Sequence, residues 1–382
     1  MKKHIQLSLY FILLNIVLAS AQSFTSGGIK YSIISGTTNV SVAVQPTTYT
    51  GAANIPASVT NSGTTFAVTT IESQAFLNCT GLTTVSLPSS INSISPDAFA
   101  ASGLTSINIP NSVTSIGFDA FSSCVGLTAI TIPNSVTSIG ESAFSACQGL
   151  TSITIPSSVT SIGDFLFYGC NHLTSVSIPN SITTIKTGMF LECSNLTSFV
   201  IPNWITEIKS QAFRYCTGLT SIYIPSSVTL IEDQTFLNCS SLTSLTCAIA
   251  APLPINANVF QSVNQSLCSL IVPTGSLSAY QTASIWENFS PITGSATLDT
   301  YPFIYNKTSI YPNPNKGRFT INSNNEIVNQ VKIYSLDGKL IFSQNTNAVD
   351  PEINIEQISK GIYLATVTSE NGRESKCKLI IN

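Results

Sequence analysis

Charged residues are scarce in this chain of 382 residues, since Asp, Glu, Lys and Arg make up 9% of it, against roughly a quarter of an average soluble domain. Apolar residues make up 43% of the chain, which is typical of a folded protein and excludes a highly charged disordered one. The formal net charge is −3, and the longest basic block is the pair Lys2 and Lys3. This composition lacks the basic surface that binds nucleic acid, so we predict no nucleic-acid partner.

Histidine is also rare, because the chain contains only His4 and His172. The sequence contains no G-x-S-x-G, H-E-x-x-H or phosphate-binding glycine motif, and no cysteine and histidine pair of catalytic type. We therefore expect no enzymatic activity, no catalytic residue, no cofactor and no bound metal. His172 falls in a corner between apolar positions, where we expect a surface loop.

Long apolar runs are confined to the amino terminus, so no transmembrane helix is predicted in the rest of the chain. Lys2, Lys3 and His4 precede an apolar run over residues 7–18, and Ala19-Ser20-Ala21 then forms a small-residue cleavage site. This pattern predicts a signal peptide at residues 1–21, with an uncleaved membrane anchor as the alternative. The protein is therefore expected to be secreted or held at the outer cell surface.

A 23-residue repeat dominates the sequence, with the pattern L-T-S-I-x-I-P-x-S-V-T-S-I-G-x-x-A-F-x-x-C. Each copy pairs an extended Thr/Ser-rich run with a second short apolar segment, which predicts two short strands per copy and a short helical turn at A-F-x-x-C. A unit of this size cannot close a core alone, so the copies must stack as a solenoid. The repeated phenylalanines are Phe76, Phe99, Phe121, Phe144, Phe167, Phe190, Phe213 and Phe236.

The repeats resemble the BspA-type leucine-rich repeats, also called the treponemal class, over roughly residues 55–245. The resemblance implies a curved solenoid with the L-x-x-I-x-I strands on the concave side. It also implies a cell-surface or secreted protein, since some members are adhesins. The predicted fold is mainly β: an N-terminal cap (22–70), about eight repeats (71–245), a C-terminal cap (246–290) that contains Trp286 in its core, a linker (291–307), and a β-sandwich (308–382).

The β-sandwich is predicted from five alternating segments, at residues 319–321, 331–334, 339–342, 362–367 and 376–381, with hairpin turns at Asp337-Gly338 and Asn371-Gly372. Composition changes here too, because residues 22–305 carry four basic and eleven acidic residues, a net charge of −7, whereas residues 306–382 carry nine basic and seven acidic residues, a net charge of +2. One interpretation of this module is a carbohydrate-binding β-sandwich, and the other is the family resemblance given next.

This module resembles the type A carboxyl-terminal sorting domain of type IX secretion, the Por secretion system. The resemblance implies export across the outer membrane by the type IX secretion machinery, followed by removal of the domain, with anchoring in many cases. The residues that carry the resemblance are Tyr311, Pro312, Asn313, Pro314, Gly317, Asp337, Gly338, Gly361, Tyr363 and Lys378.

Ten cysteines would usually indicate disulfides in an exported protein. Seven of them share one repeat position, where stacked side chains lie about 4.8 Å apart in parallel, which is too far for a disulfide. We therefore predict buried thiols there, and a possible bridge between Cys247 and Cys268. Acidic residues recur just before the phenylalanines; we interpret them as caps of the turns, with a calcium ladder as the alternative.

The outward strand positions carry Thr, Ser and Asn, which favours either plain solubility or a docking face for protein or glycan. Ice binding is a third, weaker interpretation. Residues that break the repeat mark a hypothetical ligand-binding patch: Trp204, Tyr223, Arg214, Tyr215, Val200 and Asn108. We thus expect a non-enzymatic recognition or adhesion protein that binds an extracellular protein or polysaccharide. The alternatives are a self-associating structural component and an enzyme or enzyme accessory.

Overall fold

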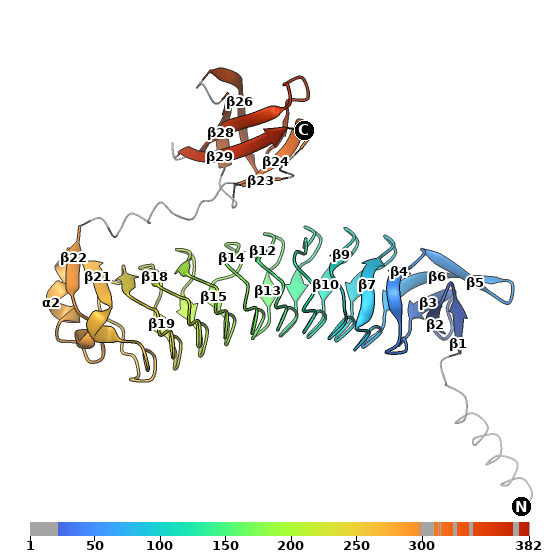
Figure 1. The fold of residues 1–382 in the computed structure, drawn as a ribbon, viewed down its shortest axis with the longest axis horizontal. Helices are drawn as coiled ribbons and strands as arrows, with labels where there is room; N and C mark the ends of the chain where they lie inside the picture. The colour runs from blue at the N-terminus through green and yellow to red at the C-terminus, as the bar shows by residue number, and fades with distance from the viewer. Residues whose placement is uncertain are drawn as a thin grey trace, which may run out of the picture. The chain divides into compact units, whose positions relative to one another are not determined.

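The computed structural model describes residues 22–296, 298, 309–311, 313, 315–323, 327–335, 339–369 and 374–381 (Figure 1). The predicted signal peptide, residues 1–21, lies outside these residues. The chain divides into two compact units, one of Met1–Leu150 and Ile162–Cys170, the other of Thr151–Ser161 and Asn171–Asn382. Both units contain turns of a β-solenoid, about ten turns of about 23 residues, so the predicted fold class is confirmed.

Most turns of the solenoid contain two short parallel strands, as the repeat predicts. The L-x-x-I-x-I segment forms the first strand, and inward Leu and Ile side chains alternate there with outward polar ones. The strands of this series in the first unit are β4 (Thr50–Asn54), β7 (Gly81–Ser86) and β9 (Ser106–Asn108). Those in the second unit are β12 (Ser152–Thr154), β14 (Ser175–Ser177), β16 (Ser198–Val200), β18 (Ser221–Ile224), β20 (Ser244–Cys247), β21 (Ser269–Pro273) and β22 (Ile292–Ser295).

The Ser-Ile-Gly segment, or the segment in the same repeat position, forms the second strand. Where this segment ends in glycine, the glycine lies against the backbone of the preceding turn, since a Cβ built on Gly140 would come 2.4 Å from the Phe118 nitrogen. Only glycine fits such a close approach. This series comprises β8 (Ser93–Ile94), β10 (Ser115–Ile116), β11 (Ser138–Ile139), β13 (Ser161–Ile162), β15 (Thr184–Ile185), β17 (Glu207–Ile208) and β19 (Leu230–Ile231).

The repeated phenylalanines form the centre of the core, with their rings stacked from turn to turn. Adjacent ring centroids lie 5.5–6.1 Å apart from Phe76 to Phe167 in the first unit. They lie 5.2–5.5 Å apart from Phe190 to Phe260 in the second. Every one of these rings is fully buried, so each turn depends on its neighbours for its core.

The predicted helical turn at A-F-x-x-C is wrong. The residues two before and two after the phenylalanine adopt left-handed backbone angles, as Asp97 (φ 54°) and Ala101 (φ 52°) do around Phe99. This arrangement turns backbone N–H groups toward the next coil, where the Phe99 nitrogen donates to the Ala120 carbonyl at 2.9 Å. The N–H groups of the turn therefore alternate between bonds to the next coil and three-residue bonds within the coil, such as that from Ala100 to Asp97 at 3.1 Å, whereas an α-helix would form four-residue bonds within the coil throughout.

The N-terminal cap is a small antiparallel sheet that joins the parallel one. Strands β1 (Ser23–Ser26), β2 (Ile29–Ile33) and β3 (Asn39–Val42) are antiparallel, and β3 pairs in parallel with β6 (Thr64–Ile71), to which β5 (Ser58–Asn61) adds a hairpin. The cap thus covers the edge of the first coil.

The solenoid extends further at its C-terminal end than the repeat pattern predicts. Phe260 adds a ring to the stack, β21 and β22 extend the parallel sheet, and β22 lies inside the predicted linker. The helical elements here are short and follow one another in the order η1 (Gln265–Leu267), η2 (Thr274–Ser276), α2 (Leu277–Tyr280) and η3 (Trp286–Asn288). Trp286 is fully buried and donates to the Leu253 carbonyl at 2.9 Å, as expected for a core residue.

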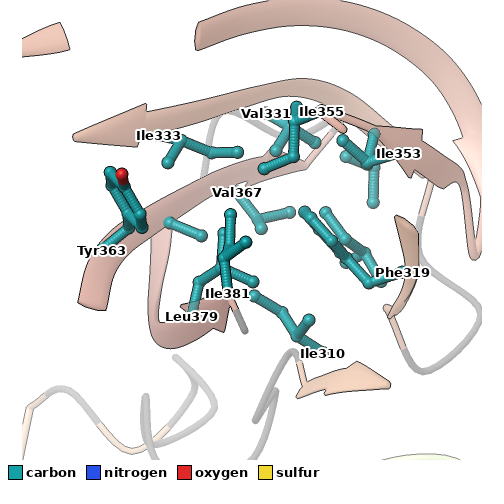
Figure 2. Close-up of a cluster of buried hydrophobic side chains, with 13 residues drawn as sticks. Ile310, Phe319, Val331, Ile333, Ile353, Ile355, Tyr363, Val367, Leu379 and Ile381 are labelled. Atoms are coloured by element: carbon teal, nitrogen blue, oxygen red, sulfur yellow. The ribbon is translucent and has the colours of Figure 1, made fainter. Parts of the chain in front are cut away.

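The C-terminal module is a β-sandwich, which confirms the prediction. One sheet has the order β23-β24-β27 and the other β26-β25-β28-β29, and a buried cluster that includes Phe319, Val331 and Leu379 fills the space between them (Figure 2). The sequence missed β23 and β27. The strands are β23 (Ser309–Tyr311), β24 (Arg318–Asn322), β25 (Ile327–Tyr334), β26 (Leu340–Val349), β27 (Glu352–Asn354), β28 (Gly361–Ser369) and β29 (Glu374–Ile381).

Candidate functional site

The outward positions of the first strand series form the candidate site, which we call the strand face. In the first unit the side chains of Ser86, Asn108 and Thr131 occupy equivalent positions, and all three are exposed. Strand β7 pairs in register with β9 through Ser86 and Asn108, and Asn108 forms a bridge with Thr131 in the next coil. Stacking thus places these side chains in one row across the coils.

Much of the hydroxyl content of the strand face has a structural role. In four of the L-T-S-I or equivalent segments the first threonine (Thr105, Thr174, Thr220 or Thr243) donates its hydroxyl to the carbonyl of its counterpart one coil earlier. Thr105 bonds in this way to Thr83 at 3.0 Å, and Thr220 to Thr197 at 2.9 Å. The second repeated threonine does the same, as in the bond of Thr229 to Thr206 at 3.1 Å. These ladders tie each coil to the previous one, which explains the recurring threonine without a ligand.

The remaining outward positions are not used by the ladders. Within the part of the chain that the structure describes, the side chains of Ser106, Asn108, Thr131, Ser152 and Thr154 make no hydrogen bond, and all are exposed. Their donors and acceptors are therefore available to an external group. The backbone that carries them is held by the strands and the threonine ladders, so a ligand would meet side chains in fixed places.

In the second unit, the outward strand positions of the C-terminal coils are less polar. The register places Val200 beside Tyr223, Tyr223 beside Thr246, and Thr246 beside Ile271. Tyr223 is 6% exposed and donates its hydroxyl to the Leu298 carbonyl at 3.3 Å. Two of the predicted ligand-binding residues, Val200 and Tyr223, are thus neighbours, but a residue beyond β22 already covers part of the tyrosine.

Trp204 interrupts a third ladder, which serine residues form at the corner after I-P. Ser135 donates its hydroxyl to the Val113 carbonyl at 2.6 Å, and Ser181 donates to Val159 at 2.6 Å. Trp204 occupies the equivalent position, and its buried Nε1–H has no partner among the described residues. Ser158, also in this column, has a buried hydroxyl that likewise lacks one.

Arg214 and Tyr215 lie elsewhere, on the turn that contains Phe213. The guanidinium carbon of Arg214 is 5.0 Å from the centre of the Tyr215 ring, and one guanidinium nitrogen donates to the Gln234 side-chain oxygen at 3.0 Å. The five predicted binding residues of the second unit therefore do not form one patch. Val200 and Tyr223 share the strand face there, Arg214 and Tyr215 share the turn side, Trp204 occupies the corner, and Asn108 belongs to the first unit.

The cysteines are buried thiols within the solenoid, as predicted. In the repeat column the thiol donates to a phenylalanine carbonyl of the preceding coil, for example from Cys147 to Phe121 at 3.1 Å. Burial raises the pKa of Cys147 well above its ordinary value and that of Cys170 to about 12. Such thiols are poor nucleophiles, because the thiolate form is the reactive one.

The predicted bridge between Cys247 and Cys268 is wrong, because both residues carry thiols. The strand register explains this, since Ser244 lies opposite Ser269, which places Cys268 about four residues, or roughly 13 Å, from the level of Cys247. A disulfide needs Cα atoms within about 7 Å. Cys247 instead lies 3.3 Å from the Tyr280 hydroxyl.

The acidic residues near the turns have mixed roles. Burial, together with the charges of Asp97 and Glu141, raises the pKa of Asp119, while a hydrogen bond with Ser122 lowers it. That bond is to the Ser122 side chain, so capping of backbone N–H groups by Asp119 stays a prediction. Glu232 instead reaches the previous coil, where its carboxylate accepts the Ser210 N–H at 3.0 Å. Among the residues that the structure describes, no cluster of three or more His, Cys, Asp or Glu could hold a metal.

His172 is exposed, as expected for a loop residue. Among the described residues, no helix is long and apolar enough to cross a membrane.

Several residues of the predicted sorting signal hold the sandwich together. The Asn313 side-chain oxygen accepts the Ile380 N–H at 2.8 Å, and the Asn315 N–H donates to the Ile380 carbonyl at 3.0 Å. The amino-terminal motif is thereby joined to the last strand. Sequence reasoning missed Asn315, which is 5% exposed. Its place between Pro314 and Gly317 in the motif was enough to identify it as part of the sorting signal.

Gly317, Gly361 and Tyr363 of the predicted sorting signal also have structural roles. Gly317 has a φ of 90°, and a Cβ there would come 2.7 Å from the Glu356 Cα. The Tyr363 hydroxyl donates to the Ser359 carbonyl at 2.7 Å, and Gly361 begins β28. Tyr311 is 67% exposed. Pro312, Pro314, Asp337 and Gly338 lie outside the described residues, as does the side chain of Lys378.

Comparison with protein families identifies both modules. The model of the BspA type leucine rich repeat region matches residues 56–144 and 114–243, in six copies. The model of the secretion system C-terminal sorting domain matches residues 309–382. These ranges coincide with the solenoid repeats and with the sandwich, which confirms both resemblances.

Known proteins are similar to different parts of the chain, and the first of the following matches supports the solenoid fold. A leucine-rich repeat protein from Bacteroides ovatus has 28% sequence identity and a TM-score of 0.56, and the match covers 71% of this chain and 76% of that chain. A leucine rich cell surface protein from Faecalibacterium prausnitzii has 23% identity and a TM-score of 0.43, over 74% of this chain and 97% of that chain. The ulvan lyase NLR42 from Nonlabens ulvanivorans is 35% identical over 74 residues, which are 19% of this chain and 14% of the lyase.

Proposed function

Since the chain consists of BspA-type leucine-rich repeats followed by a type IX secretion sorting domain, and is therefore delivered to the cell surface or secreted, we propose that it is a non-enzymatic recognition protein. Its ligand is an extracellular protein or polysaccharide, and the strand face binds it. The observation that carries this proposal is the row of exposed polar side chains that the threonine ladders leave unused, with Asn108 and Thr131 at its centre.

The chemistry of the row suits a polar, extended ligand. Amide and hydroxyl groups both donate and accept hydrogen bonds, and repeated spacing along the coils allows many weak contacts at once. In the second unit, the partly exposed Val200 would add an apolar contact, whereas Tyr223 is 6% exposed and supports it from beneath. Trp204, Arg214 and Tyr215 lie off the strand face, so they would contribute only to a ligand that also covers the corner or the turn side.

The similarity to an ulvan lyase does not favour an enzyme. The matched segment covers 14% of the lyase and has 74 residues, the length of the sorting-domain match in this chain. We therefore do not transfer lyase activity to the solenoid.

Binding of the full chain to an immobilised panel of extracellular-matrix proteins, bacterial surfaces and polysaccharides at physiological salt tests the proposal. A saturable hit supports recognition. Silence across the panel, together with ligand-free oligomers on size-exclusion chromatography, contradicts it and favours the structural alternative. Depolymerisation of any polysaccharide on the panel contradicts the non-enzymatic part.

A further inference from the structure

One sheet of the sorting domain exposes several large apolar side chains. Leu340 is 48% exposed, Ile341 38%, Ile362 45% and Leu364 37%, and all four belong to the sheet β26-β25-β28-β29. Large apolar side chains are ordinarily buried, and contiguous exposed ones mark an interaction site in a soluble protein.

Strand register places Leu340, Ile362 and Leu364 on the same surface, and Ile341 lies at the β-bulge next to Leu340. Tyr334 on β25 lies between Leu340 on β26 and Leu364 on β28, and Ile362 lies opposite Ile380 on β29. Neighbouring positions on the same strands, such as Ile333 and Tyr363, point into the core between the sheets (Figure 2). The apolar row is therefore on the outer surface of the four-stranded sheet, and we call it the outer patch: Tyr334, Leu340, Ile341, Ile362, Leu364 and Ile380.

The outer patch is not needed to close the domain core, because a separate buried cluster of thirteen residues does that. A basic residue borders the outer patch. Of the residues that share this surface on β25, β26 and β28 and whose side chains the structure describes, only Lys332 is charged, and it lies two residues from Tyr334. A complementary partner would have an apolar surface bordered by carboxylates.

The size of the outer patch indicates a transient partner. Partial exposure of the four most exposed side chains amounts to about 300 Å² of apolar surface. A stable interface buries roughly 800 Å² on each partner, so the patch is too small to form a lasting dimer of this chain. A cargo that must be released after export needs a weak contact of this kind.

We infer that the outer patch is the docking surface through which the sorting domain engages a protein component of the secretion machinery, one that presents an apolar surface bordered by acidic residues. This inference rests on the sorting function of the domain. The motif residues Asn313, Gly317 and Tyr363 would then maintain the fold, while the outer patch makes the contact.

Export of the full chain in a bacterium that has a type IX secretion system tests the inference. The double variant Leu340→Ser with Leu364→Ser should reach the outside at least tenfold less than the unsubstituted chain and accumulate in the periplasm. Val349→Ser is the matched control, since Val349 is 45% exposed at the far end of β26. It should be exported normally, and both variants should have unchanged thermal unfolding.

Normal export of the double variant would overturn the inference. A chain that lacks residues 309–382 distinguishes failure of the sorting function from failure of the docking surface. If that chain is also exported, the sorting function is wrong. If it is retained while the double variant is exported, only the docking surface is wrong. Two other results would also overturn it. One is a dimer on size-exclusion chromatography that the double variant abolishes. The other is binding to phosphatidylglycerol vesicles that the double variant abolishes.

Discussion

The serine ladder at the corner of the coils offers a matched pair of substitutions. The Ser135 hydroxyl donates to the Val113 carbonyl at 2.6 Å, whereas the Ser158 hydroxyl occupies the same repeat position, is buried and has no partner among the described residues. Each serine can be changed to alanine with the loss of one oxygen atom, so packing differs little between the two variants.

The hydrogen-bond energies predict opposite results for the pair. Ser135→Ala removes a bond and leaves the Val113 carbonyl without that donor, which costs about 1–2 kcal/mol. Ser158→Ala replaces an unsatisfied hydroxyl by a hydrogen and should be neutral or stabilise the fold by up to about 1 kcal/mol. The two variants should therefore differ by about 2 kcal/mol.

Urea unfolding followed by far-UV circular dichroism measures this difference. With an m-value on the order of 3 kcal/mol per molar urea, the two midpoints should lie about 0.6 M apart, provided that m is the same for both variants. If Ser135→Ala destabilises no more than Ser158→Ala, the ladder does not stabilise the stack and the reasoning is refuted.

Three further predictions concern the thiols and the close contacts between coils. Iodoacetamide should modify all ten cysteines of the unfolded, unreduced protein but at most the half-buried Cys377 of the folded one; a shortfall of two adducts after unfolding would reveal a disulfide. Burial raises the pKa of Cys124 and Cys247 from 9.0 to about 11 and that of Cys239 to about 12. Between pH 9 and 12 only the unfolded chain releases these protons, so the urea midpoint should be constant below pH 9 and fall over that range. A midpoint that stays flat up to pH 10.5 would contradict this. Gly140→Ala should destabilise the fold by about 3 kcal/mol, whereas Gly275→Ala, with no atom within 4 Å of its Cβ position, should change the unfolding free energy by less than about 0.5 kcal/mol; equal effects of the two changes would show that the close approach of the coils is unimportant.

The period of the repeat was enough to predict the solenoid, its two strands per coil and the buried cysteine column. A side chain that recurs every 23 residues must stack on its counterpart, whatever the local conformation. The turn around Phe99 was not predictable in the same way, because Asp97 and Ala101 adopt left-handed angles that their residue types do not demand. Hydrogen bonds to the next coil compensate for that backbone cost.

Features that depend on contacts between distant segments were also missed. Phe260 joins the ring stack although its segment lacks the I-P-x-S-V-T-S-I-G pattern, and the bond from Tyr223 to Leu298 spans 75 residues. The candidate binding residues were chosen because they break the repeat. That criterion identifies single positions and does not show which residues are neighbours in space. Only the strand register shows that Val200 and Tyr223 are adjacent and that Arg214 is not beside them.

The most direct test of the account compares binding by two variants of the full chain with binding by the unsubstituted chain, for the strongest saturable hit on the ligand panel. The double variant Asn108→Lys with Thr131→Lys places two long charged side chains on the strand face, and the control Phe118→Lys changes a residue that is 49% exposed after β10, away from that face. We predict at least a tenfold loss of affinity for the double variant and no change for the control. Equal affinity of all three chains would contradict the claim that the strand face is the recognition surface.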